Sequence, residues 1–225
     1  VVLTGSQKSI YNRDTDARNN LWRAVAYACH PDAWGVQIVF DNQVILGTRA
    51  RKTRTKSFNA FSSIDYPETA MFRDRRLIQF LQRPAEYTHA VFSTALDPNV
   101  FVLRLVPGMR ADIIPMLEGR YRALVLESFG VGGLPGGDDG AMFAAVRDWC
   151  GAGHLAVFTT QVPHEGSDLA VYEVGRAAKA LPGVLEAHDM TPEATAVKLM
   201  WVLGQTTDRA EAEKLFLTPV QWDIL

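Results

Sequence analysis

Short apolar runs separated by polar segments dominate the first half of the chain. Residues 1–3 (VVL) read as a buried strand, which the polar Thr4–Gln7 segment ends. Residues 36–40 and 43–47 are two further apolar runs, and only Asp41-Asn42 separates them. Two strands joined by a two-residue turn form a hairpin. We therefore expect strands at these three places.

A helical repeat occupies residues 16–29. Asp14 or Asp16 is placed to cap its first turn, and His30-Pro31 ends it. A carboxylate pair around Thr15 could also be functional, but capping is the simpler explanation. The apolar positions that share one face of this helix are Leu21, Trp22, Val25 and Cys29.

The second half alternates regularly between strand and helix patterns. We expect strands at 100–106, 123–129 and 155–160, a short segment at 184–187, and helices at 112–118, 139–150, 170–181, 192–203 and 209–216. This alternation predicts an α/β fold with a parallel sheet and helices on both faces. Because ligands bind at the carboxyl ends of such strands, the loops that matter most are 4–15, 128–138 and 159–168.

The middle of the chain is mixed and turn-rich. A strand is expected at 77–81, and the domain linker falls within residues 83–99. We expect two domains, residues 1–90 and 91–225.

Composition limits the function classes. The chain has 225 residues, 48% hydrophobic and 21% charged, with a net charge of −2. That balance favours neither nucleic acid nor an anionic membrane. No apolar run approaches the roughly 18 residues that would span a bilayer. Cys29 and Cys150 are expected as free, buried thiols, which fits a reducing cytoplasm. The histidines share no metal-ligand spacing, so no metal site is expected.

Residues 130–137 (GVGGLPGG) form a glycine-rich turn between a strand and a helix. This is where a phosphate-binding loop would lie, but Pro135 replaces the third glycine of the dinucleotide pattern. A tight turn with Asp138 or Asp139 as helix cap is the favoured interpretation. A loop for a small ligand and a nucleotide site remain as alternatives.

A basic loop covers residues 49–56. No aromatic residue interleaves with its cations, which argues against a nucleic-acid surface. Two interpretations remain. The loop is either fully solvated, or one of its cations is buried at a site while the neighbouring cations stay exposed to solvent. A lysine paired with a carboxylate can assist proton transfer, because burial and neighbouring charges shift its pKa.

In order along the chain, the segments VVLTGSQ, DARNNLWRA, GTRARKTRTKSFNAFSS, LESFGVGGLPG and DMTPEATAVKLMWVLG resemble the bacterial L-asparaginase family, most closely its cytoplasmic type I branch. The resemblance covers essentially the whole chain. It implies a two-domain α/β fold in which the remainder of an N-terminal α/β domain precedes a smaller parallel α/β domain. It also implies hydrolysis of L-asparagine to L-aspartate and ammonia without a cofactor.

The resemblance assigns two residues to the site. Lys52 falls on the family's catalytic lysine, and Ser6 on a residue that lines the substrate pocket through its backbone. The attacking group in the family is a threonine, which needs a base and oxyanion donors to react. The two threonine-rich segments that carry it and its acidic partner are absent from this sequence. We therefore expect Lys52 to lie partly dehydrated against an acidic group outside this chain, which alone would be inactive.

Two further departures and several alternatives accompany the resemblance. Gly133 stands where some relatives extend an asparagine toward a neighbouring subunit, and no partner-supplied carboxylate matches around 162–168. Relatives are dimers or tetramers, and type I members are expected to bind asparagine at a second, regulatory site. Two other functions stay open: a non-catalytic asparagine-binding module, and an amidotransferase subunit that acts on aminoacyl-tRNA, for which the basic loop is the only support.

Overall fold

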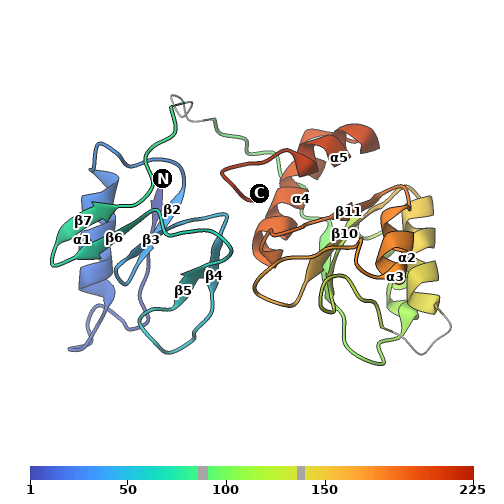
Figure 1. Ribbon diagram of the computed structural model, residues 1–225, viewed down its shortest axis with the longest axis horizontal. Coiled ribbons are helices and arrows are strands. Elements are labelled where there is room, and N and C mark those ends of the chain that lie inside the picture. The colour runs from blue at the N-terminus through green and yellow to red at the C-terminus, as the bar shows by residue number, and fades with distance from the viewer. Residues whose placement is uncertain (86–90, 136–139) are drawn as a thin grey trace. The chain divides into compact units, whose positions relative to one another are not determined.

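The structure is a computed structural model that describes residues 1–85, 91–135 and 140–225. The chain divides into two compact units, residues 1–92 and 93–225 (Figure 1). Each unit has its own sheet and its own hydrophobic core. Within the described residues, no helix is long and apolar enough to cross a membrane. The α/β class expected from the sequence is confirmed.

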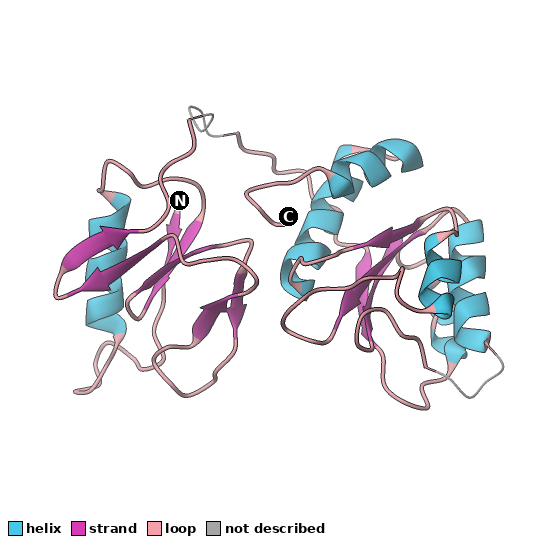
Figure 2. Cartoon of the chain, viewed as in Figure 1, coloured by secondary structure: helices cyan, strands magenta, loops and turns pink. Residues whose placement is uncertain are grey.

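The first unit contains a five-stranded sheet and a separate two-stranded ribbon (Figure 2). The sheet has the order β1-β2-β3-β6-β7, in which β1 is parallel to β2 and every other pair is antiparallel. Its strands are β1 (Val2–Leu3), β2 (Gln37–Phe40), β3 (Gln43–Leu46), β6 (Ala70–Arg73) and β7 (Arg76–Gln79). The ribbon pairs β4 (Ala50–Lys52) with β5 (Phe61–Ser63).

The hairpin predicted around Asp41-Asn42 is confirmed. Phe40 pairs with Gln43, so the two residues between them make the turn. Asp41 has a positive φ of 55°, as tight hairpin turns require. The strand expected at 77–81 is present as β7, but its partner β6 and the β4–β5 ribbon were not foreseen, because their three or four residues are too short to show periodicity.

Helix α1 (Ala17–Ala28) lies where the sequence predicted a helix, but the predicted buried face is wrong. Leu21 and Val25 are about half exposed, whereas the residues that face the sheet are Asn20, Ala24 and Tyr27. Ala24 and Tyr27 belong to the core of this unit, and Asn20 is buried because hydrogen bonds satisfy its side chain, so hydrophobicity alone did not identify the face. The expected buried state of Cys29 is likewise wrong, since this free thiol is exposed.

The second unit contains a fully parallel sheet of order β11-β10-β9-β8, as predicted. The strands are β8 (Val100–Arg104), β9 (Ala123–Ser128), β10 (Leu155–Thr160) and β11 (Val184–Glu186). All six residues of β10 are buried, which is typical of a central parallel strand covered on both faces. The short segment expected at 184–187 is therefore the fourth strand of this sheet.

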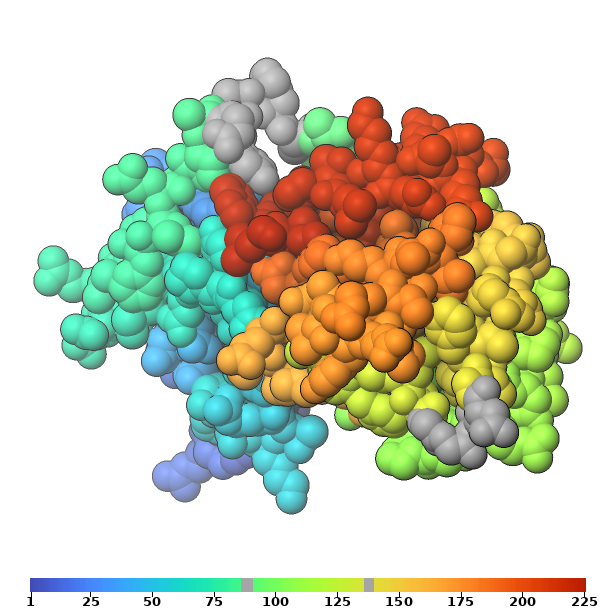
Figure 3. All heavy atoms as spheres, turned by 45° about the vertical axis from the view of Figure 1, so that its right-hand side comes forward, coloured from blue at the N-terminus to red at the C-terminus, as the bar shows by residue number. Residues whose placement is uncertain are grey.

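Helices cover both faces of the parallel sheet. They are α2 (Ala141–Gly151), α3 (Glu173–Lys179), α4 (Pro192–Gln205) and α5 (Arg209–Leu217). One core lies under α4 and α5, and another under α2 and α3. The helix expected at 112–118 is instead two single 3₁₀ turns, Ala111–Ile113 and Pro115–Leu117, because Pro115 has no N–H for a continuous helix. In the space-filling view, α5 and the C-terminal residues form a continuous surface of this unit (Figure 3).

Candidate functional site

A buried carboxylate accepts hydrogen bonds from the backbone of the loop after β1. Asp16 is 6% exposed, and its side chain accepts hydrogen bonds from the backbone N–H groups of Gln7 (2.9 and 3.1 Å) and Lys8 (3.0 Å). Burial opposes the charge on Asp16, but these donors and the Asn20 amide outweigh it, so its pKa lies below the ordinary value. The sequence suggested that the Asp16 side chain caps α1, but it makes no capping hydrogen bond. The Thr15 hydroxyl instead accepts a hydrogen bond from the backbone N–H of Ala17.

Asn20 is the second anchor of this loop. It is 1% exposed, and its Nδ2 donates to the carbonyl oxygen of Gly5 (2.9 Å) and to Asp16 (3.1 Å). Its Oδ1 accepts from the backbone N–H of Asp41 in the β2–β3 turn (3.0 Å). A buried polar side chain that satisfies backbone groups on two segments fixes both of them. Ser6 lies exposed at the surface of the loop held in this way.

The predicted catalytic lysine ends the short strand β4. Lys52 pairs with Phe61 of β5, and its Nζ lies 5.9 Å from the centre of the Phe61 ring. Beyond it, the backbone N–H groups of Thr53 and Arg54 both donate to Ala60 O (2.9 and 3.1 Å), which closes the loop between the two strands. Ala60, which accepts these two hydrogen bonds, is fully buried.

The Gln7 side chain joins these two segments. Its Oε1 accepts from Lys52 Nζ at 3.2 Å, and its Nε2 donates to Ser57 O at 2.9 Å. The structure thus brings the loop that carries Ser6 to the lysine that the resemblance assigned. Sequence reasoning missed both Gln7 and the anchoring role of Asp16. The short sequence separation between Gln7 and Asp16 could have indicated their contact, because a carboxylate can accept hydrogen bonds from the N–H groups of a nearby loop.

Lys52 itself is exposed, so the expected partial dehydration is not produced by the described residues. The deeply buried cation of the basic loop is Arg49, which is 0% exposed and lies 5.7 Å from the ring centre of Tyr66. Burial raises the pKa of the Tyr66 hydroxyl, and the Arg49 charge opposes this shift. The loop therefore does combine one buried cation with exposed neighbours, but the buried cation is Arg49 and not Lys52.

The described part of the glycine-rich segment, residues 130–135, begins with a tight turn that closes at Gly133, in keeping with the interpretation favoured from the sequence. Phe129 and Gly133 exchange backbone hydrogen bonds of 3.0 and 2.7 Å. Gly132 has a φ of 149°, and an added Cβ there would lie 2.5 Å from the Leu169 side chain. The proposed caps Asp138 and Asp139 lie outside the described residues, and Gly140 stands at the N-cap of α2.

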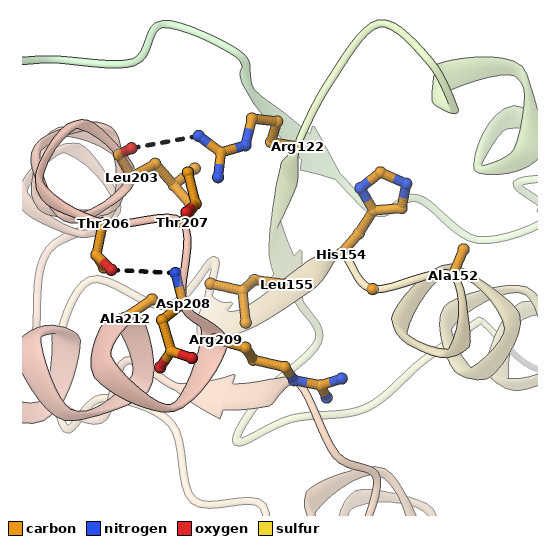
Figure 4. Close-up of a pocket in the computed structure, with 11 residues that line it drawn as sticks. Arg122, Ala152, His154, Leu155, Leu203, Thr206, Thr207, Asp208, Arg209 and Ala212 are labelled. Carbon is orange, nitrogen blue, oxygen red and sulfur yellow. Dashed lines mark hydrogen bonds between the residues drawn. The ribbon is translucent and has the colours of Figure 1, made fainter.

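A pocket of about 220 Å³ lies at the junction of α4 and α5 (Figure 4). Two arginines line it, and each has a carboxylate partner. Arg122 donates to Asp97 (2.7 Å) and to Leu203 O (3.2 Å), and Arg209 donates to Glu213 (3.2 Å). Both arginines thus have a carboxylate partner within this unit, although Nη2 of Arg209 is buried and has no hydrogen-bond partner among the described residues. The pocket also lies before β9 and β10, at the ends of the strands opposite to those that usually carry active groups.

The described ranges contain no group of three or more His, Cys, Asp or Glu residues that could hold a metal ion. What the Lys52 site offers is an ammonium, a fixed amide oxygen and exposed hydroxyl and backbone groups around Ser6. Such groups can transfer protons and bind a polar substrate.

Two family models match the chain. A model described as "Asparaginase, N-terminal" matches residues 1–86, and one described as "Glutaminase/Asparaginase C-terminal domain" matches residues 99–216. Two curated relatives align with nearly the whole chain. The L-asparaginase of Thermococcus kodakarensis is 38% identical over 96% of this chain and 64% of its own length. One of the subunits of the glutamyl-tRNA(Gln) amidotransferase of Pyrococcus furiosus is 33% identical over 97% of this chain and 51% of its own length. The chain thus spans between half and two-thirds of the length of these relatives.

Solved structures agree with these matches. The thermostable L-asparaginase from Thermococcus kodakarensis superposes with a TM-score of 0.92 at 35% identity, over 100% of this chain and 67% of that one. The L-asparaginase I of Vibrio cholerae shares the fold, with a TM-score of 0.84 at 23% identity over 100% of this chain and 67% of that one. Both domain models and the structural matches cover the two units described above, and the chain belongs to the asparaginase family.

Proposed function

We propose that this protein is an L-asparaginase that hydrolyses the side-chain amide of L-asparagine to L-aspartate and ammonia. Lys52 acts in proton handling, and the backbone at Ser6 lines the substrate pocket. The observation that carries the proposal is the contact between Lys52 Nζ and Gln7, which places the lysine beside the Ser6 loop. The family membership and the 38% identical L-asparaginase support it.

The chemistry needs a nucleophile that residues 1–225 do not supply in the family pattern. A threonine hydroxyl would attack the amide carbon and pass its proton to a carboxylate, while an ammonium would donate a proton to the departing nitrogen as the C–N bond breaks and ammonia leaves. A water molecule would then hydrolyse the acyl-threonine ester and release aspartate. We infer that this threonine and the acidic partner of Lys52 come from a segment beyond the present sequence, so that residues 1–225 alone are inactive. The longer relatives leave room for such a segment.

The proposal also covers the family branch, the domain boundaries, the oligomeric state and the cellular location. We place the protein in the type I branch of bacterial asparaginases, with domains at 1–90 and 91–225. We infer a homodimer or homotetramer, with asparagine as the ligand of a second, regulatory site. A cytoplasmic location is supported by two cysteines that are both free.

Amidotransferase activity on aminoacyl-tRNA is the second candidate. The Pyrococcus furiosus relative supports it, because that protein is named as part of an amidotransferase. Exposed cations in the 49–56 loop would have to contact the tRNA phosphates. Such binding weakens steeply with salt, so a salt-sensitive affinity for tRNA would favour this function.

The test uses the protein as its gene encodes it. Ammonia release is measured with asparagine, with glutamine, and with glutamine plus misacylated tRNA, and asparagine binding is measured by calorimetry. The proposal predicts tRNA-independent release from asparagine. Binding without turnover would instead indicate a non-catalytic asparagine-binding module, and ammonia release that requires tRNA would indicate the amidotransferase.

A further inference from the structure

Gln7 contacts the lysine in a way that fixes the orientation of its own amide. Its Nε2 lies 2.9 Å from the carbonyl oxygen of Ser57, which can only accept a hydrogen bond. The NH₂ end of the amide must therefore face Ser57, and the oxygen must face Lys52 Nζ at 3.2 Å. An ammonium is only a donor, so the two contacts specify the same orientation.

The backbone of Gln7 is held in place as well as its side-chain amide is. Its backbone N–H donates to both oxygens of the buried Asp16, and the neighbouring Gly5 carbonyl accepts from Asn20. Lys52, by contrast, extends from a three-residue strand on a flexible stem. A fixed acceptor limits the conformations of such a side chain, which is how a supporting residue preorganises a reacting one.

We propose that Gln7 is a positioning residue that holds the ammonium of Lys52 in its reactive place. The inference rests on the proposed function of Lys52. The chemistry of the acceptor matters: a neutral amide oxygen orients an ammonium without neutralising it, so the charge stays available to a carboxylate and to the leaving group. A carboxylate at position 7 would orient the amine but also retain its proton.

Three variants of the full-length protein test this. Gln7→Leu removes the acceptor and keeps a similar volume, and we expect kcat/KM for asparagine to fall by about 10²-fold, as misplaced reacting groups do. Gln7→Glu should move the basic limb of the pH profile of kcat/KM to higher pH. The matched control, Gln43→Leu, loses a side-chain hydrogen bond to Glu68 in the five-stranded sheet and should leave the profile unchanged.

A readout without turnover separates this inference from the proposed function. Slow amine acetylation, followed by mass spectrometry, compares Lys52 with Lys8 in the same sample. Lys52 should react about fivefold faster in Gln7→Leu, the equivalent of one lost hydrogen bond, and more slowly in Gln7→Glu. Unchanged labelling of Lys52 in both variants would overturn the positioning role, whatever the activity. Changed labelling in a protein that releases no ammonia would keep the contact and refute the function instead.

Discussion

At the scale of single residues, Asp16 organises the site without being placed to react. Its carboxylate accepts from two consecutive backbone N–H groups and from Asn20. Hydrogen bonds to an ionised group contribute more than neutral ones, about 1.5–3 kcal/mol each when measured by removal. The buried charge is therefore favourable here because several donors surround it.

Replacing Asp16 by Asn should destabilise the protein by about 2 kcal/mol, because one acceptor oxygen becomes a donor that faces other donors. The effect should depend on pH in a defined direction. The pKa of Asp16 is lowered in the folded state from its ordinary value of 3.8, so its stabilisation is present above that pH and is lost as the pH falls further. Urea unfolding of both proteins at pH 7 and at acidic pH measures this difference.

Asp14→Asn is the control for this prediction. Asp14 is exposed and pairs with Lys8 on the same loop, so its removal should leave the free energy of unfolding unchanged. If Asp16→Asn were as stable as the original protein at pH 7, the anchoring role of Asp16 would be refuted. The sequence indicated a carboxylate at this helix start but not its partners, since a cap and a loop anchor show the same residue type.

At the scale of elements, a buried ion pair attaches the end of the chain to α4. Lys198 Nζ lies 2.8 Å from the carboxylate of Asp223 and donates to Thr218 O at 2.8 Å, and both charged side chains are 4% exposed. Burial lowers the pKa of Lys198, and Asp223 opposes this shift. Ile224 beside this pair belongs to the core under α4 and α5.

Lys198→Met should cost about 3–5 kcal/mol, because it leaves the Asp223 carboxylate buried and unpaired. The double variant Lys198→Met/Asp223→Asn removes the orphaned charge and should recover part of this loss. Chemical unfolding of the single and double variants gives the two free energies. A double variant less stable than Lys198→Met would contradict the interpretation of this pair as a compensated charge.

Elements that contain a clear apolar run were predictable from the sequence, whereas the β4–β5 ribbon and β6 were not. The strand–helix alternation of the second half predicted the parallel sheet, because β9 and β10 each begin with four consecutive apolar residues. The buried face of α1 was misjudged because Asn20 enters the interior through its hydrogen bonds. Hydrophobicity alone does not show which polar residue is satisfied inside.

At the scale of the whole molecule, two units with separate cores provide the framework, and the Lys52–Gln7 contact lies within the first. Ser6 and Lys52 were found through the resemblance, and Gln7 came only from the structure. The contact between Gln7 and Lys52 joins residues 45 positions apart, and no local sequence pattern predicts such a pairing. Net charge and composition could exclude partner classes but could not locate the site.

The most direct test of the account is Lys52→Met in the protein as encoded by its gene. We predict that kcat for ammonia release from asparagine falls by about 10²–10⁴-fold, the usual contribution of a group that handles protons. The free energy of unfolding should not change, because Lys52 is exposed. Lys56→Met removes an exposed cation from the same loop and should retain full activity. Turnover by Lys52→Met at the original rate would contradict the assignment of Lys52 to catalysis.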